Sequence, residues 1–185
     1  MRTPMVWFTL VAGLALPGAG YAQQRPVVTE DPETIGASRI LVEGGLALDA
    51  GQSNAAYGIT GDIAHIATFG LSVGISPHAE VQIDGGLLQR LDVTGRTPGS
   101  PLFASTSVGV GGRTSGLEDF VIATKIRFTS ETDTRPAFGA RFGTKLPTAD
   151  PGKGIGLGTT DFFGSFLVAK TVQSVRTVGN VGLFV

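Results

Sequence analysis

Cysteine is absent from this chain of 185 residues, which excludes both a disulfide framework and a thiolate metal site. Histidine is nearly absent as well. His65 falls on the apolar face of a predicted strand near its outer rim and His78 falls in a turn, so no histidine metal site is predicted. The formal net charge of −1 excludes a polybasic protein that binds nucleic acid by charge. The sequence therefore predicts no metal, no cofactor and no nucleic-acid partner.

Long apolar runs are also missing, apart from one at the N-terminus. Residues 1–22 have the pattern of a secretory signal peptide, because Arg2 supplies a positive charge, an apolar stretch follows, and Gly20 and Ala22 are small residues at the expected cleavage site. The apolar stretch is too short to span a bilayer as a helix. We expect residues 1–22 to be removed, residues 23–37 to be a flexible periplasmic lead-in, and residues 38–185 to form one β-barrel domain.

Glycine, in contrast, is abundant, and its 28 copies favour short strands and turns over helices. In residues 118–130 the apolar Ile122 and Ile126 alternate with Lys125 and Arg127, and residues 135–147 repeat this pattern. A period of two predicts strands with one apolar and one charged face. The predicted strands are 39–49, 62–76, 79–93, 118–130, 135–147, 159–170 and 175–185. Because cations in mid-strand exclude a dry sandwich core, we expect an all-β, antiparallel transmembrane barrel that is wet inside and apolar outside.

The connections between these strands are predicted to alternate in length. Long loops are expected at 50–61, 94–116 and 148–158, and short turns near 77, at 131–134 and at 171–174. This alternation is typical of outer-membrane barrels, which have short periplasmic turns and longer external loops. Residues 102–110 are the one alternative strand within these loops.

Three short motifs carry a family resemblance. They are GLED at 116–119, KLPTAD at 145–150 and GLGTTD at 156–161. They resemble the outer-membrane family of meta-pathway phenol-degradation proteins, over about residues 63–185. The resemblance implies a β-barrel transporter in the outer membrane of a Gram-negative cell, with outer-membrane lipid around it. Its solute would be a small molecule, hydrophobic or aromatic.

The chain departs from this family in two ways. Ala149 stands where the family pattern has glycine, and family members continue through further strands. Seven predicted strands are an odd number, whereas single-chain bacterial barrels have an even number. We therefore expect a truncated member of the family. Missing strands or an oligomer would have to close its barrel, because an open strand edge is not tolerated in lipid.

Charged residues on the predicted inner face are candidates for lining a lumen. The first three strands contribute acids, with Asp49 and Asp92 among them, and the fourth and fifth contribute bases. The candidate lumen-lining residues are Glu43, Glu80, Asp84, Lys125, Arg127, Arg141 and Lys145. Opposed acidic and basic sectors would orient dipolar solutes across a lumen. The alternative is that these charges pair and fill a narrow barrel.

Catalytic motifs are not predicted, and the chain is not expected to be an enzyme. A serine–histidine hydrolase would need an outward serine near His65, but the residue expected opposite it is Gln89. The glycine-rich residues 152–156 lack the spacing of a phosphate-binding loop. Asp150 and Asp161 are better explained as solvated strand ends than as calcium ligands.

The sequence thus predicts an outer-membrane barrel for passage or binding of small molecules. One alternative is a structural or interaction barrel with a salt-bridged lumen. Another is a soluble periplasmic barrel of lipocalin type, which would place its apolar face inward. An aromatic girdle of tyrosine and tryptophan is missing after the signal peptide, where only Tyr57 remains, and this counts against the membrane interpretation.

Overall fold

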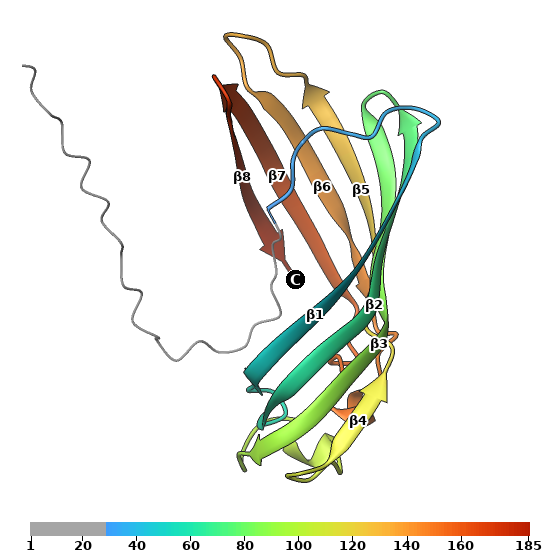
Figure 1. Ribbon diagram of the computed structural model, residues 1–185, viewed down its shortest axis with the longest axis vertical. Coiled ribbons are helices and arrows are strands. Elements are labelled where there is room, and N and C mark those ends of the chain that lie inside the picture. Colours follow the sequence, from blue (N-terminus) through green and yellow to red (C-terminus); the bar gives the residue numbers. More distant parts are fainter. Residues whose placement is uncertain (1–28) are drawn as a thin grey trace, which may run out of the picture.

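The computed structural model describes residues 29–185 and is shown in Figure 1. The predicted signal peptide and the first residues of the predicted lead-in lie outside this range. The strands are β1 Ile40–Asn54, β2 Ile59–Ser76, β3 Ala79–Arg96, β4 Arg113–Gly116, β5 Phe120–Thr129, β6 Ala137–Leu146, β7 Asp161–Val172 and β8 Val175–Phe184. Two short 3-10 helices, η1 Phe103–Ser105 and η2 Pro151–Lys153, lie in the connecting loops. Within the described range no helix is long and apolar enough to cross a membrane.

The strands form one antiparallel sheet that curls into an open half-barrel (Figure 1). The order is β1-β2-β3-β5-β6-β7-β8, and the short β4 pairs with β3 beside β5. Each strand of the main path pairs with its neighbour in the chain, as predicted for an all-β antiparallel fold. Gln89 lies opposite His65, as the turn at Pro77 predicts. Among the described residues β1 pairs only with β2, and β8 only with β7, so the two edges of the sheet are open.

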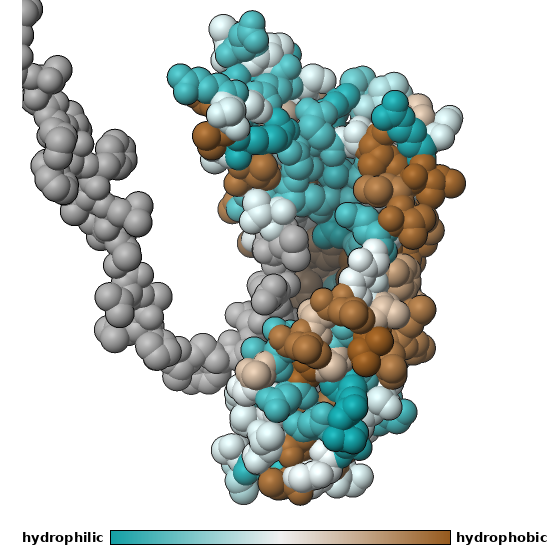
Figure 2. All heavy atoms as spheres, in the orientation of Figure 1, coloured by the Kyte–Doolittle hydropathy of each residue, from teal (hydrophilic) through white to brown (hydrophobic). Residues whose placement is uncertain are grey.

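The convex face of the sheet is apolar and exposed, whereas the concave face is polar and buried. Val42, Leu48 and Leu183 are 72%, 83% and 81% exposed. On the opposite face Glu80 and Lys125 are buried. Figure 2 shows hydrophilic side chains in the hollow and hydrophobic ones along the outer flank. The period-two pattern of the sequence is therefore folded with its apolar side outward, the reverse of a soluble protein.

Within residues 29–185 a cluster of buried apolar side chains lies at the end of the sheet that carries the long loops. It consists of Tyr57, Ile59, Leu91 and Val93, with Leu102, Val108 and Leu157 packed against it from the loops. These loops close over the concave side of β2 and β3, so the side chains inside them are apolar.

Near this cluster the side chains of β2 and β3 point to the faces opposite to those predicted. The alternation in the sequence predicts Leu91 and Val93 on the outer face and Asp92 on the inner face, but both apolar residues are buried and Asp92 pairs with the exposed Arg113. In β2 the cause is an irregularity near Ala67, where β1 and β2 shift register and the backbone φ is +53°. β3 stays in register with β2 on both sides of this point, so its side chains reverse at the same level. One extra residue in a strand turns every later side chain to the other face.

Two of the predicted connections are also different. Residues 50–61 are mostly strand, because β1 and β2 extend to leave only residues 55–58 as a turn, so the first loop is short. Residues 102–110 contain η1 and no strand, and the additional strand, β4, comes just after them. The alternation of long and short loops therefore holds only from β2 onward.

Candidate functional site

A short acidic segment crosses the concave face of the sheet. We call residues 30–36 the acidic strap, because Glu30, Asp31 and Glu33 fall within it. In Figure 1 this blue segment passes in front of β7, β6 and β5 before it leads into β1. The strap lies so close to the sheet that a Cβ atom on Gly74 would come 1.8 Å from the carbonyl oxygen of Gly36. Only glycine fits at position 74 with the strap in this place.

Lys125 lies at the centre of this interface. Its Nζ is 3.0 Å from Glu80 Oε1, on the neighbouring strand β3, and 3.1 Å from Glu30 Oε1, on the strap. The lysine side chain is only 8% exposed and that of Glu80 only 1%. The backbone N–H of Ile35 also donates to Glu80 Oε2 at 2.6 Å. Burial of these charges is tolerated because each has a partner of opposite sign.

Arg141 on β6 extends the same network toward the middle of the sheet. Its guanidinium contacts Glu30 Oε2 and Asp84 Oδ2, both at 2.8 Å. It also donates to Gln82 Oε1 at 2.7 Å, and the amide nitrogen of Gln82 donates to Glu30 Oε1 at 2.7 Å. The contact between Arg141 and Asp84 spans the intervening strand β5, so the long arginine side chain joins β6 to β3.

Two further arginines hold the rest of the strap. Arg127 pairs with Glu33 and donates to the carbonyl oxygen of Pro77 at 2.9 Å. Arg176 on β8 binds Asp31 through both carboxylate oxygens, at 2.5 and 2.8 Å. This bidentate hydrogen bonding by Arg176 lowers the pKa of the Asp31 carboxyl below its usual value. The strap is thus bound to side chains of β3, β5, β6 and β8 on the concave face.

Lys145 lies farther along the concave face, near the loop end. Its Nζ pairs with Asp161 at the start of β7 and is 3.5 Å from Asp119 Oδ2. Asp119 Oδ1 accepts a hydrogen bond from the backbone N–H of Ala149, which fixes the loop after β6. The same loop accepts a hydrogen bond at the carbonyl oxygen of Gly156 from the Tyr57 hydroxyl. Burial raises the pKa of Tyr57. These contacts are structural, since they join loops to strand ends.

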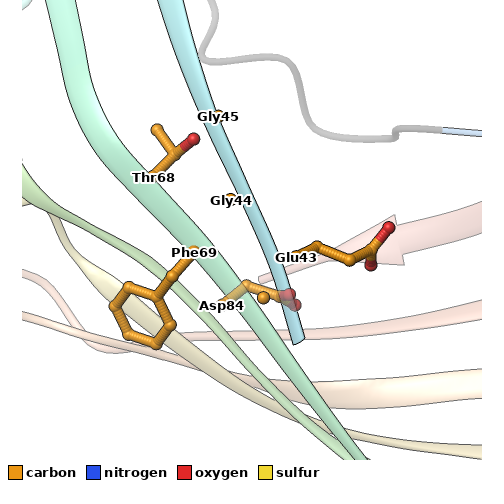
Figure 3. Close-up of a pocket in the computed structure, with 7 residues that line it drawn as sticks. Glu43, Gly44, Gly45, Thr68, Phe69 and Asp84 are labelled. Atoms are coloured by element: carbon orange, nitrogen blue, oxygen red, sulfur yellow. The ribbon is translucent and has the colours of Figure 1, made fainter. Parts of the chain in front are cut away.

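Glu43 and Asp84 border a shallow hollow on the side of β1 (Figure 3). Gly70 lies between them, and a Cβ atom there would be 3.2 Å from Asp84 and 3.7 Å from Glu43. Figure 3 shows Phe69 on the other side of the sheet. The hollow opens widely to solvent and its two carboxylates have like charge, so it offers no enclosed binding pocket.

His65 lies on the concave face, although the sequence predicts it on the outer one. Its Nδ1 is 2.8 Å from Glu118 Oε1 and its Nε2 is 3.4 Å from Asp49 Oδ2. The irregularity at Ala67 accounts for this reversal too. Among residues 29–185 no group of three or more acidic or histidine side chains has an arrangement that could hold a metal ion.

The predicted lumen-lining residues therefore fall into three groups on one face. The network around the strap contains five of them, Glu80, Asp84, Lys125, Arg127 and Arg141. Lys145 lies near the loop end, and Glu43 lies by β1. The anions of the strap, Glu30, Asp31 and Glu33, were not among the predicted site residues. The only mark they leave in the sequence is three acids within four residues. No family model, curated protein or solved structure matches this chain.

Proposed function

We propose that this chain forms the wall of an outer-membrane β-barrel that binds or passes small molecules. The supporting observation is the distribution of its side chains, with exposed apolar residues on the convex face and charges on the concave face. A lipid bilayer surrounds the outside of a barrel with hydrocarbon and leaves its inside polar. A soluble barrel of lipocalin type needs the opposite arrangement.

The open edges of β1 and β8 shape this proposal further. Unpaired strand edges are not tolerated in hydrocarbon, so in a bilayer both edges need a partner strand. Additional strands of a longer polypeptide, or a second copy of the chain, would supply it. The resemblance of the motifs at 116–119, 145–150 and 156–161 to the phenol-degradation family extends the proposal to hydrophobic or aromatic solutes.

A second candidate function is a structural barrel with a filled lumen. It is favoured by one observation, which is that five cations of the concave face each contact at least one carboxylate. They are Lys125, Arg127, Arg141, Lys145 and Arg176. Fixed pairs of this kind leave none of these five cations free to bind a solute. The two candidate functions differ in whether the strap can dissociate from the sheet, because binding or passage of a solute requires its release and a filled lumen requires that it stays.

An arginine on the convex face tests the membrane assignment. Phe142 lies in the middle of β6 and is 47% exposed, so Phe142→Arg creates no internal clash. In a bilayer this cation costs about 2–4 kcal/mol near the midplane, and assembly into outer membranes should fall sharply. Thr134→Arg is the matched control, because Thr134 is exposed in the loop between β5 and β6.

Fractionation of cells gives the readout. We expect the unmodified chain and Thr134→Arg in the outer-membrane fraction and Phe142→Arg largely lost from it. Recovery of the unmodified chain in the soluble fraction without detergent would reject the proposal. Gly143, the inward neighbour of Phe142, is unsuitable as a control, because a Cβ atom there would lie 2.3 Å from the Ile122 carbonyl oxygen.

A further inference from the structure

The acidic strap occupies a surface with the features of a binding site for a small molecule. The Glu30 carboxylate lies between Lys125 and Arg141, two cations that face each other on the adjacent strands β5 and β6. Two residues along, the ring of Pro32 is fully buried against the sheet. A Cβ atom on Gly139 would lie 3.1 Å from the Pro32 Cβ, so the ring fills the space that glycine leaves open.

The sheet under the strap supplies both halves of such a site. Lys125 and Arg141 provide charge, and Gln82 provides an amide that donates to the same carboxylate. Beside these polar groups the surface of the sheet is apolar and has few side-chain atoms, because it is formed by Gly139 and by the buried Leu167 opposite it. Phe163, on the same face of β7, lies 5.0 Å from the Arg141 guanidinium carbon and supports it. This combination fits a carboxylate joined to a compact apolar ring.

We propose that the concave face holds a binding site for a small ring carboxylate, and that the strap is its tethered, displaceable competitor. In this arrangement the Glu30 carboxylate stands in for the ligand carboxylate and Pro32 for its ring. This inference rests on the proposed function and deepens it, since it names the solute class and the residues that recognise it.

The contacts of the strap suit an exchangeable occupant. Lys125 keeps Glu80 and Arg141 keeps Asp84 when Glu30 leaves, so neither cation loses all its partners. Glu30, Asp31 and Glu33 are partly exposed, and they regain water on release. A tethered group competes at an effective concentration of the order of millimolar, so a free ligand of equal intrinsic affinity must reach a similar concentration to displace it.

Calorimetric titration of the full chain in detergent micelles with benzoate tests the proposal. Glu30→Gln removes the competing charge without touching the sheet. We expect benzoate to bind this variant about tenfold more tightly than the unmodified chain, because one set of charge-assisted hydrogen bonds no longer has to be broken. Glu33→Gln is the matched control, since Glu33 pairs with Arg127 outside the site, and it should change the affinity far less. Benzyl alcohol, which has the ring without the carboxylate, should not bind.

A second pair of variants locates the site. Arg141→Met should abolish benzoate binding, and Lys170→Met, which removes a cation that pairs with Glu131 away from the strap, should preserve it, with circular dichroism as the check that both retain the sheet. Failure of Glu30→Gln to bind benzoate, or equal affinities for Glu30→Gln, Glu33→Gln and the unmodified chain, would overturn the inference and favour a fixed plug. Those results leave the membrane assignment untouched, because fractionation decides it separately. A soluble chain that binds benzoate would reject only the membrane assignment.

Discussion

Replacement of Lys125 by methionine is the perturbation for which the structure gives the clearest magnitude. Methionine keeps most of the length of the side chain and removes its charge. Glu30 then keeps Arg141 at 2.8 Å and can turn toward water. Glu80 cannot, because its side chain is only 1% exposed. The substitution therefore leaves one carboxylate buried without a cation.

Breaking one side of a buried ion pair costs about 3–5 kcal/mol. Glu80 retains hydrogen bonds from the Gln82 amide at 2.9 Å and the Ile35 N–H at 2.6 Å, so we expect the lower end, about 3 kcal/mol. With a urea dependence of about 1–3 kcal/mol per molar, the unfolding midpoint should fall by about 1–3 M. Far-UV circular dichroism in detergent micelles follows the loss of the sheet.

Two companion variants make this result interpretable. Lys170→Met removes a more exposed lysine, whose Nζ is 3.4 Å from Glu131, and should cost about 0–1 kcal/mol. The double variant Lys125→Met with Glu80→Gln removes the stranded charge and should recover most of the lost stability. The reasoning fails if Lys125→Met is no worse than Lys170→Met, or if the double variant is as unstable as the single one.

Three further changes probe the strap and the loops. Gly74→Val should force the strap off the sheet and expose it to proteases, while Gly164→Val, which meets no atom within 4 Å, should not. Hydrogen bonds to Arg176 lower the pKa of Asp31, so this ion pair stabilises the bound strap fully at pH values above 3.8, the usual pKa of an aspartate. The stabilisation is lost as the pH falls below that value, and cleavage of the strap by an acid protease should then become faster. A cleavage rate that does not change with pH in this range would contradict the prediction. Tyr57→Phe removes a hydrogen bond to the loop after β6 and should lower the free energy of unfolding by about 1 kcal/mol, measured in urea.

The strands could be predicted from sequence because their two faces differ so strongly. Lys125 and Arg127 alternate with Ile122 and Ile126, and no other regular structure places such residues on separate faces. The same reasoning failed beyond Ala67, since a single irregular residue reverses the phase and leaves no mark in the alternating pattern itself. Leu91 and Asp92 were placed on the wrong faces for this reason.

The position of the strap on the sheet could not be predicted from the sequence, for a different reason. A polar segment with prolines has no periodicity, and its composition is that of a flexible lead-in. Its position depends on cations more than 90 residues later in the chain, such as Arg127 for Glu33. The candidate residues on the sheet could be named from their phase, but their partners could be found only from the fold.

Different forces hold the two ends of this half-barrel. At one end the strap is held mainly by partly buried ion pairs, and at the other the loops are held by the apolar cluster around Tyr57. Dissolved salt screens the first kind of attraction, whereas cooling weakens the second. Ionic strength and temperature therefore act as separate controls on the same sheet. A rise in salt should loosen the strap end more than the loop end, and a fall in temperature should loosen the loop end more than the strap end.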